Sequence, residues 1–387
     1  MSVSEALVRS LNVPAVEVLD HLGPTRFVSQ LRRGGLALEL PRGAEPNLSV
    51  ILGGGGVTLE QLTASYTALA RAGLAGTPRF EPREPLVERR MMSAGAAYIV
   101  RDILESGGPV GRAVNTAPAT TQRIAWKTGT SFGFRDAWAI GVDDRHTVGV
   151  WVGRPDGTPN PGFFGANTAA PLLVDIFTGL GAPSAVASRP RPPEVAQAPI
   201  CWPLGLRASA EAAHLCQVQR TAWLLNDAAP PTFADRLQNI EPRHTYLVSA
   251  ADGLRAERDC ARGEMLRVEA ARWPSILEPW LAPSIRKKAL PPAWSSGCGS
   301  HARFQSAFKI AGAADGEVLH RAGADAPLVR LELRGNEGSA HWMINGKLVA
   351  RTAPGAPYLH RFDAAGRYEI TAFSDAGRYD RISVSVQ

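Results

Sequence analysis

One strand-like stretch near the middle of the chain combines groups that suit an anionic ligand. Residues 123–131 read Arg-Ile-Ala-Trp-Lys-Thr-Gly-Thr-Ser, a composition that favours a β-strand. Lys127 is the only lysine in the first 286 residues, where every other cation is an arginine. Burial tunes the pKa of such an ammonium. With the hydroxyls of Thr128 and Thr130 and the bare backbone of Gly129, the strand offers donors for a carboxylate or an oxyanion.

A second short motif lies far upstream, where Ser10-Leu11-Asn12 separates two expected helices. Taken alone, Ser-x-Asn is a weak signal, and an Asn that caps a helix C-terminus is the simpler interpretation. A chance Lys-Thr-Gly in an ordinary strand is the corresponding alternative for Lys127. The significance of the motif depends on its order relative to Lys127, which follows Asn12 by 115 residues.

The elements around these motifs follow a fixed order of helical and then extended patterns. Thr58 and Gln61 form a capping box, after which apolar residues recur at helical spacing. Helices before an antiparallel sheet, with another helix packed on it, predict an α+β fold. The expected helices cover residues 2–11, 15–22, a third segment ending at Arg33, 58–73, 93–104 and 171–180, and the expected strands cover 123–131, 134–143 and 146–153.

The bulk composition limits the function classes. A length of 387 residues allows two or three domains, and the apolar fraction of 45% is enough for packed cores. The formal charge of +6 comes from arginines spread along the chain, so we expect no nucleic-acid partner. Such scattered charge suits an anionic polymer or a membrane surface. Neither a signal peptide nor a membrane-spanning helix is predicted.

Four cysteines, Cys201, Cys216, Cys260 and Cys298, lie within one segment of the chain. They form no C-x-x-C pair and have no histidine at zinc-site spacing, so we predict neither a metal nor a cofactor. An even number in a short segment indicates two disulfides and an oxidising compartment. Of the three possible connectivities, sequential pairing closes the shortest loops, which favours Cys201–Cys216 and Cys260–Cys298.

The C-terminal half divides by composition into three parts. Five prolines in residues 182–199 predict an extended linker. Residues 200–300 hold the cysteines and few periodic runs, which predicts a loop-rich, disulfide-stapled module. Residues 301–387 alternate between apolar and polar positions on both sides of Asn345-Gly346, a strong hairpin signal. Short strands at regular spacing there predict an all-β sandwich of immunoglobulin type.

Together these motifs resemble a known family. Lys-Thr-Gly-Thr-Ser at 127–131 and the strands at 134–153 are similar to the end of a penicillin-binding transpeptidase domain. That family carries S-x-x-K, S-x-N and K-T-G in this order, and Ser10-Leu11-Asn12 matches the second motif. The β-rich tail resembles that of the bifunctional, class A penicillin-binding protein 1C group. The resemblance implies residues 1–181 as the C-terminal part of the transpeptidase domain.

The resemblance also implies a role for each motif residue. Ser10 would relay a proton to the leaving amine, and Asn12 would hold the substrate amide. Lys127 would supply positive potential to this relay and to the substrate carboxylate. Thr128, Gly129, Thr130 and Ser131 would line the substrate site, with the Thr130 N–H as half of an oxyanion hole. The substrate would be a D-Ala–D-Ala stem peptide of peptidoglycan.

The first motif of the family is not found before Ser10. Ser284-Ile285-Arg286-Lys287 and Ser306-Ala307-Phe308-Lys309 match S-x-x-K but follow Lys127, in the wrong order, and we attribute them to chance. We therefore expect the C-terminal part of a longer peptidoglycan synthase, without its nucleophile and glycosyltransferase domain, that is inactive alone and binds β-lactams only with the missing half. Its full-length relative would work on the periplasmic side of the inner membrane.

A non-catalytic envelope binding or scaffolding protein that keeps half of a transpeptidase domain is the alternative. In either case the C-terminal sandwich would have an envelope protein as a possible partner. An S-x-x-K motif in the reading frame upstream of Met1 would favour the enzyme, whereas an export route beginning at Met1 would favour the scaffold.

Overall fold

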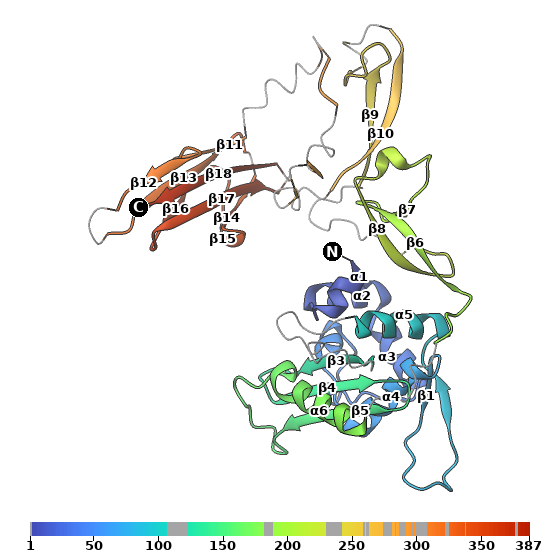
Figure 1. Cartoon of the computed structure of the whole chain (residues 1–387). Coiled ribbons are helices and arrows are strands. Elements are labelled where there is room, and N and C mark those ends of the chain that lie inside the picture. The colour runs from blue at the N-terminus through green and yellow to red at the C-terminus, as the bar shows by residue number, and fades with distance from the viewer. Residues whose placement is uncertain are drawn as a thin grey trace. The chain divides into compact units, whose positions relative to one another are not determined.

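The chain consists of two compact units. The computed structural model describes residues 2–106, 123–181, 189–229 and 242–387, the last range with gaps at 258–259, 261–262, 274–280, 283, 286–291, 296–297, 299–307, 322–324, 337 and 376–377. One unit comprises residues 1–196 with 225–227, and the other comprises residues 197–224 with 228–387. Figure 1 labels their elements. None of the helices in the described part of the chain combines the length and apolarity that crossing a bilayer requires.

Most of the first unit before the sheet is helical, as predicted. The predicted capping box is present, with Thr58 Oγ1 accepting from the Gln61 N–H at 3.1 Å. Three boundaries were predicted wrongly: the helix predicted over 2–11 ends at Val8, the helix predicted over 58–73 ends at Ala70, and the second helix begins at Asn12 rather than at residue 15. Pro14 lies in its first turn, where a missing N–H costs no hydrogen bond. The elements are α1 Val3–Val8, α2 Asn12–Leu22, α3 Pro24–Arg33, η1 Leu48–Leu52, α4 Leu59–Ala70, β1 Leu74–Gly76, β2 Glu88–Arg90 and α5 Ala94–Glu105.

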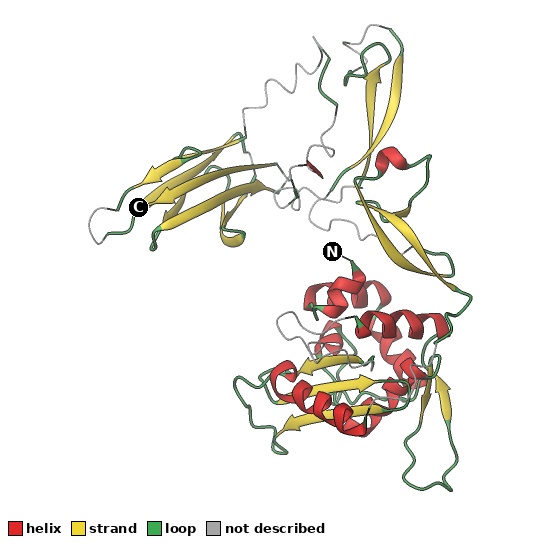
Figure 2. Cartoon of the chain, viewed as in Figure 1, coloured by secondary structure: helices red, strands yellow, loops and turns green. Residues whose placement is uncertain are grey.

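The three predicted strands form one antiparallel sheet in the order β3-β4-β5, with bounds Ala125–Thr130, Asp136–Val142 and Thr147–Gly153. Helix α6, Ala170–Leu180, follows a short π-helical turn, η2, at Gly165–Ala169. Buried side chains of the sheet and of α6 share one core, which includes Trp126 and Phe177. Figure 2 shows these helices and strands in one α+β region.

Glycines let helices approach both faces of this sheet. A Cβ at Gly141 would lie 2.7 Å from the Phe177 ring of α6, and a Cβ at Gly149 would lie 2.0 Å from Thr63 Oγ1 of α4. Gly149 pairs with Ile140, the neighbour of Gly141. Because adjacent strand residues point to opposite faces, α6 and α4 cover opposite sides of the sheet. The strand of Lys127 is therefore held in a packed layer.

The segment after α6 is tied to α5 by buried charges. The nearly buried Arg101 donates to Glu105 Oε1 at 2.8 Å, and Arg189 donates to the same carboxylate oxygen at 2.9 Å. Strand β6, Val195–Trp202, then begins inside the segment predicted as a linker over 182–199. Val195, Ala198 and Ile200 are buried, and this apolar burial outweighs the extended-linker signal of the prolines.

The cysteine-containing segment has more regular structure than the loop-rich module that we predicted. β7, Leu206–Arg207, and β8, Val218–Leu225, flank β6 in a three-stranded sheet, and β9, Arg243–Ser249, pairs with β10, Met265–Ala271. These strands are rich in alternating polar and apolar residues over only seven or eight positions. Such short alternation is easily obscured by flanking prolines and turn residues.

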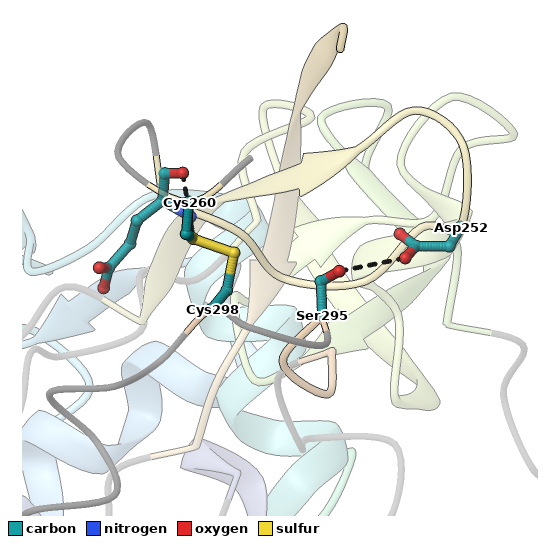
Figure 3. The surroundings of a disulfide bond; sticks show 5 residues. Asp252, Cys260, Ser295 and Cys298 are labelled. Carbon is teal, nitrogen blue, oxygen red and sulfur yellow. Dashed lines mark hydrogen bonds between the residues drawn. A yellow bond between two sulfur atoms is a disulfide. The ribbon is translucent and has the colours of Figure 1, made fainter. Parts of the chain in front are cut away.

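Both predicted disulfides are present. The Cα atoms are 4.9 Å apart in Cys201–Cys216 and 5.3 Å apart in Cys260–Cys298, within the ordinary range. Figure 3 shows the second bond, near which the Ser295 hydroxyl donates to Asp252 Oδ2 at 3.2 Å. The disulfide thus fastens the segment around Ser295 to the β9–β10 region.

Residues after 308 form a β-rich C-terminal region with two sheets, in the orders β11-β13-β16 and β12-β18-β17-β14-β15. Strands of both sheets contribute to one core around the fully buried Trp342. The predicted hairpin is confirmed, because Ile344 pairs with Lys347 and both Asn345 and Gly346 have positive φ angles. The strands are β11 Lys309–Ala311, β12 Glu317–Leu319, β13 Leu328–Arg334, β14 Ala340–Ile344, β15 Lys347–Thr352, β16 Tyr358–Arg361, β17 Gly366–Ser374 and β18 Tyr379–Val386.

The first testable prediction concerns the Cys201–Cys216 bond. Replacing both residues by Ala should lower the free energy of unfolding of the second unit by about 2–4 kcal/mol, because the unfolded chain gains conformational freedom. Denaturant unfolding followed by tryptophan fluorescence measures the change, and Ser284→Ala, which alters an exposed hydroxyl of the same unit, is the control. Peptide mapping without reductant should recover both bonds, and cross-paired or free thiols would contradict the assignment.

Candidate active site

The structure brings together two of the polar motifs that the sequence analysis singled out. Lys127 Nζ donates a hydrogen bond to Ser10 Oγ at 2.5 Å and another to the Thr128 carbonyl at 2.7 Å. Ser10 and Lys127 are separated by 117 residues, so only the packing of the helices against the sheet creates this contact. A hydroxyl and an ammonium in direct contact can pass a proton between them.

Ser10 occupies an unusual backbone conformation in the connection from α1 to α2. Its φ of 55° lies in the left-handed region, which is uncommon for residues other than glycine. The connection is closed by the Ser10 N–H donating to the Leu7 carbonyl at 3.1 Å and the Leu11 N–H donating to the Ala6 carbonyl at 3.0 Å. These bonds fix the turn, so the surrounding structure keeps the serine in its strained geometry, as is common at functional sites.

Burial changes the acidity of Lys127. Desolvation lowers the pKa of its ammonium from 10.5 to about 8, because the charged form loses more hydration than the neutral amine. The cause is the half-buried position of Lys127 within β3, directly after the buried Ala125 and Trp126. A lysine with such a pKa exchanges protons near neutral pH far more readily than an ordinary surface lysine does.

Asn12 lies two residues beyond Ser10, at the first position of α2, and its side chain is exposed. In the part of the chain that the structure describes, this amide makes no hydrogen bond to Ser10 or Lys127. Of the two polar residues of this motif, Ser10 thus contacts Lys127, whereas Asn12 exposes its amide at the start of α2. The described residues also contain no group of three or more His, Cys, Asp or Glu side chains that could hold a metal ion.

Thr130 is oriented by a residue that the sequence analysis did not identify. Thr130 Oγ1 accepts from the Gly165 N–H at 3.1 Å, so the hydroxyl hydrogen stays available for another acceptor. A Cβ at Gly165 would lie 2.4 Å from the Gly129 carbonyl oxygen and 2.5 Å from that of Trp138. Only glycine fits there, but as one of 38 glycines it carried no sequence signal. It starts the π-helical turn, a feature frequent at functional sites.

Ser131 supports the turn after the Lys127 strand. Its Oγ accepts from the Asp136 N–H at 2.9 Å, and its N–H donates to the Asp136 carbonyl at 3.0 Å. The Asp136 carboxylate in turn accepts from the Trp151 indole at 2.9 Å. These bonds join the strands on both sides of the turn and hold Thr128 and Thr130 in register. Thr128 is half-buried and Thr130 is exposed.

Comparison with known proteins first defines the class. The chain resembles the crystal structure of penicillin-binding protein 1A from Haemophilus influenzae with a TM-score of 0.50, at 16% identity over 59% of this chain and 41% of that one. At this identity the likeness shows the fold alone, which is that of a penicillin-binding protein with a partial transpeptidase-like α+β region.

The sequence comparisons define the group within this class. Penicillin-binding protein 1C from Escherichia coli (strain K12) is 41% identical over 395 residues, covering 100% of this chain and 50% of that protein. Penicillin-binding protein 1B from Vibrio cholerae is 30% identical over 169 residues, covering 40% of this chain and 21% of that protein. The chain corresponds to the C-terminal part of a class A penicillin-binding protein of the 1C-like kind. It spans about half the length of the Escherichia coli relative.

Three family descriptions match the second half of the chain. The penicillin-binding protein 1C linker domain matches residues 194–224, and the second linker domain of the same protein matches residues 238–289. The Penicillin-Binding Protein C-terminus Family matches residues 299–386. The first match begins beside β6 and contains the Cys201–Cys216 disulfide, so the segment that we predicted as linker and module includes a family domain with its own sheet.

The lowered pKa of Lys127 generates a testable prediction. Below pH about 8 both the folded and the unfolded chain carry the proton, and the folded state bears the desolvation cost. Between pH about 8 and 10.5 the unfolded state binds more protons, so stability rises with pH. The free energy of unfolding of the wild type relative to Lys127→Met should therefore increase across this window. Denaturant titrations at several pH values measure it.

Lys347→Met, a change at an exposed strand residue of the second unit, is the matched control for general effects of pH on unfolding. If the free energies of unfolding of the wild type and of Lys127→Met differ by the same amount from pH 7 to pH 10, the folded state does not change the pKa of this ammonium.

Proposed function

We propose that residues 1–181 form the C-terminal part of a D,D-transpeptidase domain that cross-links peptidoglycan stem peptides ending in D-Ala–D-Ala. The contact between Lys127 Nζ and Ser10 Oγ, 2.5 Å long, is the observation that carries the proposal. It joins the S-x-N and K-T-G motifs in the geometry that a proton relay needs. The 41% sequence identity to penicillin-binding protein 1C of Escherichia coli supports the same assignment.

In this proposal the reaction is serine acyl transfer. A serine of an S-x-x-K segment in the longer protein gives its hydroxyl proton to the lysine of that segment and attacks the carbonyl of the bond between the two D-Ala residues, which forms a tetrahedral intermediate. The C–N bond breaks, and the leaving amine of D-Ala takes a proton from the Ser10 hydroxyl. Lys127 replaces that proton. The amine of a second stem peptide then attacks the acyl-enzyme, and its proton passes through Ser10 to Lys127. The ester C–O bond breaks, and the released serine regains its proton from the lysine of the S-x-x-K segment.

The strand that contains Lys127 binds the anionic parts of the substrate. Its ammonium attracts the terminal carboxylate, and the Thr130 hydroxyl donates to this group because its oxygen already accepts from Gly165. Thr128 is the second hydroxyl for the carboxylate, and Gly129 keeps the strand open to the substrate backbone. The Thr130 N–H stabilises the oxyanion. The exposed Asn12 amide holds the substrate amide, and Ser131 maintains the turn that positions the strand.

The finer organisation of the rest of the protein belongs to the same proposal. The two C-terminal sheets close into an immunoglobulin-like sandwich, which their shared core around Trp342 supports. The longer protein also polymerises glycan and works on the periplasmic side of the inner membrane, where disulfides form. An envelope protein is the partner of the sandwich. Of the other S-x-x-K matches, Ser284 is exposed, whereas Lys287 and Ser306 lie outside the described residues.

The 387-residue chain by itself should form no covalent adduct with a β-lactam. In the proposed mechanism its residues bind the substrate and relay protons. The residues before Ser10 contain no serine followed by a lysine at the S-x-x-K spacing, so the chain offers no nucleophile there. Incubation with a fluorescent penicillin followed by a denaturing gel measures this. A saturable band that disappears in Ser284→Ala or Ser306→Ala would show that one of the later matches is the nucleophile.

Lys127 should control the acylation rate in the longer protein with its S-x-x-K segment. Lys127→Ala should slow second-order acylation by a β-lactam at least about a hundredfold, as loss of other transition-state contacts does. Lys127→Arg should also slow it, because a planar guanidinium cannot replace a compact ammonium against Ser10. Stopped-flow acylation and thermal unfolding are measured on the same preparations, with Lys347→Ala as the control. A normal rate in Lys127→Ala would remove Lys127 from the mechanism.

A further inference from the structure

The outward face of the sheet β11-β13-β16 differs from the rest of the C-terminal region. Alternate residues of these strands point inward to the core, as Ile310, Val329 and Leu331 do. The residues between them point away from the core. They are Lys309 and Ala311 of β11, Leu328, Arg330, Glu332 and Arg334 of β13, and Leu359 and Arg361 of β16.

Two leucines on this face are exposed side by side. Leu328 is 56% exposed and Leu359 is 58% exposed. Leu328 lies directly opposite Arg361, and Leu359 lies directly opposite Arg330. The two leucines are therefore diagonal neighbours, and so are the two arginines. Diagonal neighbours on a sheet face are close enough for long side chains to touch. The result is an apolar patch with guanidinium groups on its flanks.

Positive charge on this face is largely uncompensated. Arg330 pairs with Glu332 at 3.0 Å, the one carboxylate among the outward residues of the three strands. Lys309, Arg334 and Arg361 form no ion pair with any residue that the structure describes. On the five-stranded sheet, Arg351 lies 3.7 Å from Asp375 and Arg381 lies 3.1 Å from Glu369, whereas the exposed Lys347 and Arg367 form no ion pair with a described residue and can serve as controls. Asp325 and Asp363 lie outside the ends of β13 and β16.

We infer that this face binds the surface of an anionic phospholipid bilayer. Unpaired cations complement the charge of acidic headgroups, and each Lys or Arg close to such a surface strengthens binding. The leucines between them bury apolar area at the boundary of headgroups and acyl chains, while the arginine stems cover further apolar surface. An anionic glycan would complement the charge but would leave the leucines without an apolar partner. The inference is independent of the proposed transpeptidase function.

Vesicle co-sedimentation of the full 387-residue chain tests the inference. The chain should bind vesicles of phosphatidylglycerol and phosphatidylcholine, should not bind phosphatidylcholine alone, and should be released by salt. Arg334→Gln/Arg361→Gln should weaken binding about fivefold per lost cation. Leu328→Ser/Leu359→Ser should weaken binding several-fold without abolishing its salt dependence.

Matched controls come from the other sheet of the same region. Lys347→Gln/Arg367→Gln removes two exposed cations, and Leu348→Ser/Val349→Ser removes apolar side chains that are 56% and 38% exposed. Neither control should change vesicle binding. Equal binding to neutral vesicles, equal losses in the controls, or binding to isolated peptidoglycan without binding to vesicles would each overturn the inference. Because all substituted side chains are exposed, the variants should unfold at the same denaturant concentration as the wild type. If a variant does not fold, the salt and lipid dependence of wild-type binding decides the question.

Discussion

The hydrogen bond from Lys127 to Ser10 is the interaction on which the site depends. A half-buried ammonium is stable only where hydrogen-bond acceptors replace its lost hydration, and the Ser10 hydroxyl and the Thr128 carbonyl are those acceptors. The same desolvation lowers the pKa of the ammonium toward neutrality. Stability and chemistry are therefore coupled, because the contacts that allow burial of the lysine are also the contacts through which a proton would move.

Close backbone approach is the second constraint. Gly141 and Gly149 admit helices to the two faces of the sheet, and Gly165 brings the π-helical turn onto the carbonyls of Gly129 and Trp138. Each would place a Cβ within 2.7 Å of a neighbouring atom. These close contacts leave no room for a side chain at the three glycines and fix the position of the sheet. They therefore also fix the position of the strand that contains Lys127. Thr130 gains its oriented hydroxyl from the same packing.

The second unit uses different means of stabilisation. Its small sheets next to the cysteines bury few side chains, and the two disulfides hold segments that the apolar core does not. Arg255 adds to this by lying 5.0 Å from the Tyr246 ring and 4.2 Å from the Trp294 ring. The C-terminal region instead has a large core around Trp342, to which strands of both of its sheets contribute.

Many of the elements, and the chemistry of the motif residues, could be predicted from the amino-acid sequence. Local patterns were sufficient for the capping box at Thr58, the three strands after residue 123, the hairpin at Asn345-Gly346 and the cysteine pairing, because each depends on neighbours in the chain or on short loops. The resemblance to penicillin-binding proteins likewise came from contiguous motifs.

Contacts between distant groups required the three-dimensional structure. The resemblance implied that Lys127 acts on Ser10, but their local sequence carries no signal for a direct hydrogen bond across 117 residues, and nothing in the sequence near Gly165 indicates a donor for Thr130. The strand within the proline-rich segment was also settled by packing, through its buried Val195, Ala198 and Ile200, rather than by propensity. Such features follow from the burial of surfaces far apart in the chain, which outweighs local preferences of a few tenths to about 1 kcal/mol per residue.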